Sequence, residues 1–230
     1  MSFQDILVEI FGGERFPGLF HLADFSVTLR ERLVDSAKDP DVAGFKSVVC
    51  YRTGLDVATV SDPPAEIAAL RCAYERFRES TDESLRLADK PLNDLVVRTT
   101  LEVAAEHGKP GMVPRHTIRT RFSCLTLLHP LVVQFHTGLG DADITLTRAS
   151  AAHLQPVIAA NPRATFVLLH ASYPYMREAG YLTAMYANVY FDIGEVFPTV
   201  SGGGQEALLR QVLELTPTNK IMWSSEPHYY

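Results

Sequence analysis

Two histidines close apolar stretches of the sequence, and both could take part in metal or acid–base chemistry. The run VVQF leads directly into His136, and the run TFVLL leads into His170. A carboxylate, Glu226, lies at the corresponding place after KIMWSS. Imidazole nitrogens and carboxylate oxygens are the ligands that zinc and similar divalent ions take in catalytic sites, where one position stays open for water. These three residues are therefore a candidate metal site.

A second interpretation of the histidines stays open. A single histidine at the end of a strand is more often a hydrogen-bonding residue than a metal ligand, whereas two at equivalent positions favour convergence on one site. A metal-bound water has its pKa lowered to about 7, so it can attack a carbonyl or phosphoryl centre. If the histidines hold a metal, the residues predict a hydrolase.

Alternating helix and strand patterns surround these residues. Short Val-, Ile- and aromatic-rich runs predict strands, and apolar residues at three- or four-residue intervals predict helices. The predicted strands are 7–11, 44–57, VVQFH, TFVLLHAS, NVYFDIG and KIMWSSEPH, and the predicted helices are 25–37, 63–80, 93–110 (capped by Gly108), 148–162, YPYMREAGYLTAMYA and QEALLRQVLELTP. This alternation is typical of a mostly parallel α/β sheet with helices outside. In such folds the carboxyl ends of the strands meet at one mouth, where His136, His170 and Glu226 would converge.

Composition narrows the class of protein. The chain has 230 residues, of which 47% are hydrophobic, and this suits one large domain or two small ones. A net charge of -6 and a pI near 5.7 argue against nucleic-acid binding. Three cysteines without CxxC spacing argue against a disulfide framework and favour a reducing compartment. No signal-peptide pattern or long apolar run occurs, so we expect a cytoplasmic protein that does not contact membranes.

Four long stretches resemble the amidohydrolase superfamily, in particular the amidohydrolase-related part of fungal fluG-type and nodulin/glutamine-synthetase-like proteins. The similarity covers most of 40–110 and 132–228. The stretches are GFKSVVCYRTGLDV, VVQFHTGLGD, TFVLLHASYPYMREAGYLTAMYANVYFDIG and KIMWSSEPH. This resemblance implies a metal-dependent hydrolase with a (βα)8 TIM-type barrel, acting on a C–N or related bond of a small-molecule substrate.

The resemblance also implies particular metal ligands. Family members take them from an HxH pair on the first strand, a Lys or Glu on the fourth, single histidines on the fifth and sixth, and an Asp on the eighth. By motif position Lys46 matches the fourth-strand residue, and His136 and His170 match the fifth and sixth. Glu226 falls where the family has its acid, as the last ligand or the catalytic base. The implied cofactor is a divalent metal ion, with zinc as the first choice. Lys46 could be carboxylated to bridge two ions, or could simply pair with an acid.

The sequence departs from this pattern in several places. No HxH pair occurs among the histidines, which are residues 21, 107, 116, 129, 136, 153, 170 and 228. We expect a barrel that lacks the first strand or strands and the final helix, and that forms one partial domain over 1–230. Glu226 in place of Asp adds a methylene group, which would displace the carboxylate by roughly 1 Å and could cost ~100-fold in rate.

Residues 111–131 form an atypical inserted segment. They show neither helical nor strand periodicity, and a connection of this length is unusual inside a compact α/β unit. The segment could be the translation of an unremoved intron, or it could be a genuine lid or binding loop. A spliced message that joins Pro110 to Val132 or Val133 would support the intron, whereas the full stretch in mature message would exclude it.

Arg52 and Tyr173 follow predicted strand ends and are candidate substrate-binding residues. The planar guanidinium of an arginine suits a substrate carboxylate. Packing and capping of the loops is the alternative role for both side chains.

Three functional interpretations follow. The first is a metal-dependent hydrolase in which His136 and His170 hold the metal. The second is a catalytically impaired pseudoenzyme or regulatory binding module with a fluG-like role in development. The third is a partial barrel that cannot fold alone, whose open sheet edges favour association, for example as a homo-oligomer.

Overall fold

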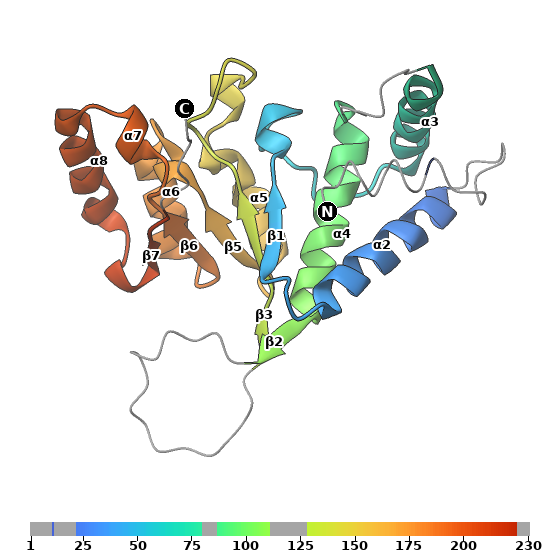
Figure 1. The fold of residues 1–230 in the computed structure, drawn as a ribbon, viewed down its shortest axis with the longest axis horizontal. Coiled ribbons are helices and arrows are strands. Elements are labelled where there is room, and N and C mark those ends of the chain that lie inside the picture. Colours follow the sequence, from blue (N-terminus) through green and yellow to red (C-terminus); the bar gives the residue numbers. More distant parts are fainter. Residues whose placement is uncertain (1–10, 12–21, 80–86, 111–127, 225–230) are drawn as a thin grey trace.

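A five-stranded parallel sheet forms the centre of the molecule, in the strand order β1-β4-β5-β6-β7 (Figure 1). The computed structural model describes residues 11, 22–79, 87–110 and 128–224. The described strands form an open sheet and do not close into a barrel, so the expected α/β fold with an incomplete barrel is confirmed. The strands are β1 (Gly44–Ser47), β4 (Val132–Phe135), β5 (Thr165–Leu168), β6 (Val189–Asp192) and β7 (Ile221–Met222).

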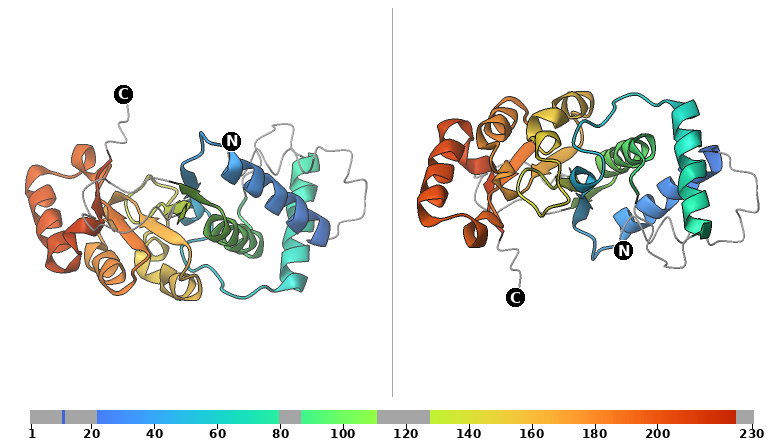
Figure 2. Two further views of the ribbon diagram at one scale, coloured as in Figure 1. Left: turned by 90° about the horizontal axis from the view of Figure 1, so that it is seen from below. Right: turned by 90° about the horizontal axis from the view of Figure 1, so that it is seen from above.

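Helices connect the strands and cover one face of the sheet. The helices α4, α5 and α6 lie along this face, α8 packs on α6, and α2 and α3 pack beside α4 (Figures 1 and 2). None of the helices that the structure describes combines the length and apolarity needed to span a membrane. The helices are α2 (Leu22–Lys38), α3 (Pro63–Glu79), α4 (Lys90–Glu106), α5 (Gln155–Ala160), α6 (Met176–Met185), α7 (Val196–Thr199) and α8 (Gly202–Leu215).

Side-chain alternation along the strands gives the sheet two different faces. Phe135, Phe166 and Phe191 are fully buried against the helices, and the rings of Phe135 and Phe166 stack with their centroids 5.6 Å apart. The register pairs Lys46 with Gln134, and because side chains alternate, both point to the opposite face. Lys46 is exposed there. The helix-covered face is therefore the core.

Several expected boundaries are wrong because the chain leaves the sheet earlier than its composition indicates. The predicted strand 44–57 is only four residues long and continues as a 3-10 helix, η1 (Val49–Tyr51). The amides of Thr53 and Gly54 both donate to the carbonyl of Val49, which winds the chain into a turn. Valine and tyrosine are common in strands, so their presence concealed this turn.

The region predicted as one helix at 148–162 consists of three short pieces, η2 (Leu146–Arg148), η3 (Ala151–Leu154) and α5. A proline lies in the first turn of α5. Proline has no N–H group to donate and is tolerated only at the start of a helix, so the α-helix begins there. Trp223, which follows β7, is 66% exposed.

The end of α4 also differs from the prediction, because His107 is its C-cap and Gly108 begins a strand instead. This strand, β2 (Gly108–Pro110), pairs antiparallel with β3 (Leu128–Pro130). The strand β2 directly precedes the inserted segment and β3 lies near the end of it, while 111–127 lies outside the described residues. Both interpretations of that segment stay predictions. The predicted strand at 7–11 also lies outside the described residues, apart from Phe11.

A buried ion pair joins α3 to α4. Arg98 of α4 contacts Glu66 of α3, and their side chains are 13% and 3% exposed. Glu66 also accepts a hydrogen bond from the Ser61 hydroxyl at 3.0 Å, and Arg98 donates to the carbonyl of Ala58 at 3.0 Å. The guanidinium of Arg98 therefore neutralises the buried carboxylate of Glu66, and the carboxylate neutralises the guanidinium.

We expect Arg98→Met to lower the free energy of unfolding by about 3 kcal/mol, because it leaves the buried carboxylate of Glu66 without its counter-charge. The matched control is Arg210→Met, which breaks a pair with Glu206 whose side chains are 75% and 67% exposed. We expect that control to cost at most about 0.5 kcal/mol. Urea unfolding measures both losses, and equal losses would contradict the prediction.

Candidate metal centre

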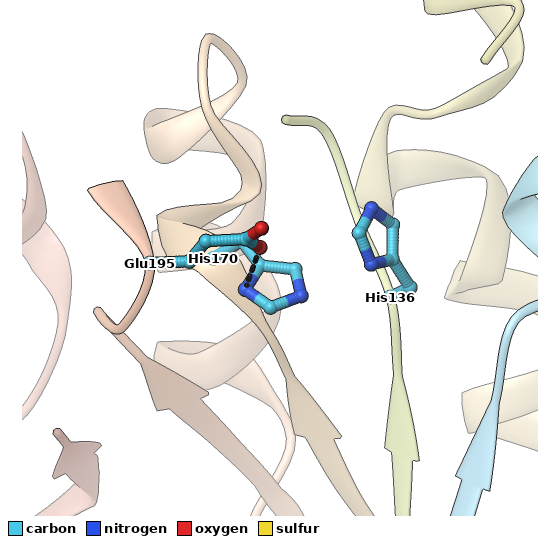
Figure 3. A group of neighbouring side chains, drawn as sticks. All are labelled: His136, His170 and Glu195. Carbon is cyan, nitrogen blue, oxygen red and sulfur yellow. Dashed lines mark ion pairs between the residues drawn. The ribbon is translucent and has the colours of Figure 1, made fainter. Parts of the chain in front are cut away.

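Three side chains meet at the carboxyl end of the sheet: His136, His170 and Glu195 (Figure 3). One potential ligand atom from each lies within 4.8 Å of the others. The ring centroids of the two histidines are 4.4 Å apart, and Nδ1 of His170 is 2.8 Å from Oε2 of Glu195. His170 thus lies between the carboxylate and the other imidazole.

His136 is positioned by the end of β4. Its amide donates to the carbonyl of Ser47 at 3.0 Å, which continues the pairing with β1 beyond the last strand residue. The ring nitrogen Nε2 lies 2.6 Å from the carbonyl oxygen of Leu139. Because a carbonyl can only accept, Nε2 carries the hydrogen in this arrangement, and Nδ1 keeps its lone pair. Nδ1 is therefore the atom of His136 that could bind a metal.

His170 and Glu195 both lie on left-handed backbone. The φ angles are 64° at His170, 50° at Ala171, 49° at Ser172 and 61° at Glu195. Residues other than glycine adopt this region at a cost of about 1–3 kcal/mol each, and such conformations concentrate at functional sites. The two donors that follow β5 and β6 are thus presented by strained turns.

The surroundings of His136 keep its imidazole neutral. Burial, together with the charge of the neighbouring His170, lowers the pKa of His136 to about 4, against smaller opposing contributions. The ring of Tyr51 lies on His136 with its centroid 4.4 Å away. Burial, with the negative charges of Asp141 and Glu195, raises the pKa of Tyr51 to about 12. A neutral imidazole is the form that binds metals.

This shift predicts a pH dependence for the metal-free protein. Unfolded His136 takes up a proton below about pH 6.5, whereas folded His136 stays neutral until about pH 4. Its contribution to stability is therefore complete above pH 6.5 and is lost as the pH falls toward 4, by about 3 kcal/mol in total. Urea unfolding of wild type and His136→Gln over this range measures it, and parallel pH profiles for the two proteins would contradict it.

The other predicted site residues lie around this cluster in different ways, and their roles stay predictions. Lys46 and Arg52 line a cavity of about 710 Å³ between β1, α2 and α4, and this cavity does not include the two histidines. Tyr173 follows the His170 turn and packs partly buried against the core. Glu226 lies outside the described residues. The cavity is large, but the converging donors identify the cluster as the better candidate for chemistry.

Sequence reasoning missed Glu195. It comes three residues after the end of β6. The rule that site residues lie at the carboxyl ends of strands points instead to Asp192, the last residue of that strand. Its only signal in the sequence is an acidic residue after the FDIG motif. Its carboxylate reaches His170 because the chain makes a left-handed turn at Glu195, and the sequence does not indicate this turn.

The donor set fits a divalent metal ion. Two imidazole nitrogens and a carboxylate oxygen are a common combination in catalytic metal sites. His136 and His170 are 4% and 1% exposed, and the lone pair of His136 Nδ1 is left available by the hydrogen bond at the other nitrogen.

Comparison with known proteins shows which proteins this chain is similar to. Residues 128–227 match the amidohydrolase family. The chain is 44% identical over 208 residues to protein fluG of Emericella nidulans, a match that spans 90% of this chain but only 22% of fluG. A crystal structure of a Lactobacillus casei protein assigned as a metal-dependent hydrolase superposes with a TM-score of 0.70 and 25% identity, over 97% of this chain and 49% of that one. The expected resemblance to amidohydrolases is confirmed.

Proposed function

We propose that this relative of the amidohydrolases is a metal-dependent hydrolase that cleaves a C–N or related bond of a small molecule. The observation that carries the proposal is the convergence of His136, His170 and Glu195 within 4.8 Å at the carboxyl end of a parallel sheet. This edge is where α/β enzymes of the barrel type bind their substrates. The family match and the similarity to a metal-dependent hydrolase support a hydrolase in general terms.

His136 would hold the ion through Nδ1, and His170 and Glu195 would supply the remaining donors. Zinc suits nitrogen and oxygen ligands of this kind. A bound divalent ion lowers the pKa of a water ligand and polarises a carbonyl, which is the chemistry that hydrolysis of an amide needs.

Other residues would prepare the site for this chemistry. Tyr51 packs against the ring of His136, and the backbone N–H of Asp141 bonds to the tyrosine oxygen. The positive charge of Lys46 contributes to the low pKa of His136, so Lys46 acts on the site through its field. We further propose that Arg52 and Tyr173 bind a substrate acid and that Glu226 serves as the base or last ligand.

Metal content tests the proposal directly. Protein dialysed against Zn²⁺ or Mn²⁺ and then freed of excess ion is expected to retain about one ion per chain by elemental analysis. The loaded protein should then hydrolyse members of a panel of small amides. Metal at background level would reject the hydrolase.

Background metal would favour a second candidate, a regulatory binding module without turnover. The specific observation in its favour is that the sequence contains no HxH pair, which the family uses as two of its ligands. The similarity to fluG is compatible with either candidate.

A further inference from the structure

Asp192 lies between the two strained turns of the metal centre without being one of the three clustered donors. It is the last residue of β6 and is 3% exposed. Its neighbours in the sequence, Ile193 and Gly194, lead directly to Glu195. A carboxyl group buried at this point needs hydrogen-bond donors around it.

Three donors surround the Asp192 carboxyl group. The amide of Gly194 donates to Oδ2 at 3.0 Å, and the hydroxyl of Ser224 donates to the same oxygen at 3.1 Å. The backbone N–H of His170 also bonds to this carboxyl group. One side chain therefore ties together the turn after β5, the turn after β6 and the segment after β7.

The packing around Gly194 shows how closely these segments approach. A Cβ atom at Gly194 would lie 1.9 Å from Oγ of Ser224 and 2.9 Å from Oδ2 of Asp192. Only a glycine fits this space. The segment between Asp192 and Glu195 is thus pressed against the hydrogen-bond partners of Asp192.

Left-handed φ angles at His170 and Glu195 persist only where the surroundings determine the backbone. Asp192 constrains the backbone in this way. Its carboxyl group accepts hydrogen bonds from the amide of His170 itself and from the amide of Gly194, which immediately precedes Glu195. We propose that Asp192 is a positioning residue that holds the two turns presenting His170 and Glu195 to the metal. Its role in metal binding rests on the function proposed above, whereas its hold on the two turns does not.

Titration with Co²⁺ tests the effect on the centre. Asp192→Asn keeps the size of the side chain but can accept through only one oxygen, and it is expected to weaken Co²⁺ binding by roughly 10–100-fold, as loss of an outer partner of a ligand does. The visible spectrum of bound Co²⁺ should also change, which a general loss of stability would not produce. The matched control is Asp35→Asn, an exposed position on α2 that should leave both unchanged. Wild-type affinity and spectrum in Asp192→Asn would overturn the proposal.

Hydrogen exchange in the metal-free protein tests the hold on the turns independently of any metal. The amides of His170 and Gly194 are expected to exchange about tenfold faster in Asp192→Ala than in wild type, and Asp192→Asn should restore part of the protection. Asp35→Ala should leave both amides unchanged. Wild-type exchange rates in Asp192→Ala would overturn the proposal. If wild type failed to bind Co²⁺, the proposed function would fall, and the exchange rates would still decide the role of Asp192.

Discussion

His170→Ala is expected to abolish stoichiometric metal binding. The imidazole of His170 lies between the other two donors, 4.4 Å by ring centroid from His136 and 2.8 Å from the Glu195 carboxylate. Its removal leaves one imidazole and one carboxylate that no longer share a neighbour. Two protein donors are fewer than catalytic zinc sites ordinarily use, so we expect affinity to fall by at least ~100-fold. Isothermal titration with Zn²⁺ measures the change.

His153→Ala is the matched control for this prediction. His153 is also a histidine that bonds to a carbonyl, with Nε2 2.9 Å from the oxygen of Thr147. It is exposed, and among the residues that the structure describes it belongs to no donor cluster. The control should therefore bind Zn²⁺ as wild type does. Unchanged binding in His170→Ala, or equal losses in both variants, would show that the metal binds elsewhere.

The positions of His136 and His170 could be predicted because they depend on a regular feature. Both follow strands of a parallel sheet, and the carboxyl ends of such strands meet at one edge. The apolar run VVQF coincides with β4, and the run TFVLL covers all of β5 and one further residue. The hydrophobic pattern of the sequence and the geometry of parallel sheets were therefore enough to predict that the two imidazoles lie close together.

Glu195 could not be predicted because its place depends on a conformation that its residue type does not favour. A φ of 61° is typical of glycine or asparagine, and glutamate adopts it here under the constraint of tertiary contacts. The short 3-10 pieces after β1 and before α5 were missed for a related reason. Segments of three or four residues are determined by individual backbone hydrogen bonds, and such bonds leave no periodic pattern in the sequence.

Lys46 lies on the strand next to the one that carries His136, and its role as a metal ligand stays a prediction. Its position in the sequence was read from a resemblance, and the register places it on the same sheet face as Gln134, one strand away from His136. Its positive charge contributes to the low pKa of His136. Sequence alignment can identify the strand that carries a residue, but the distance to the donors depends on how the sheet curves.

Gly138 joins the two histidine turns, and we expect it to tolerate no side chain. It follows His136 by two residues, with a φ of 65°. A Cβ atom there would lie 2.3 Å from the carbonyl oxygen of Tyr173 and 2.4 Å from the carbonyl carbon of Ser172. Both are backbone atoms of the turn that presents His170, so they cannot move aside as a flexible side chain could. The hydroxyl of Thr137 donates to the carbonyl of Leu169 at 2.6 Å and holds the two segments together.

Gly138→Ala is therefore expected to lower the free energy of unfolding by roughly 4 kcal/mol, through overpacking and through the cost of left-handed backbone for alanine. The variant that folds should also bind Zn²⁺ more weakly, since the turns that carry His136 and His170 must separate. Gly203→Ala in α8 is the control, because nothing lies within 4 Å of its added Cβ. It should be neutral or stabilising by about 0.5 kcal/mol, since alanine is the better helix former. Urea unfolding and Zn²⁺ titration of both variants measure these effects, and a Gly138→Ala protein as stable as the control would show that the two turns are not in close contact.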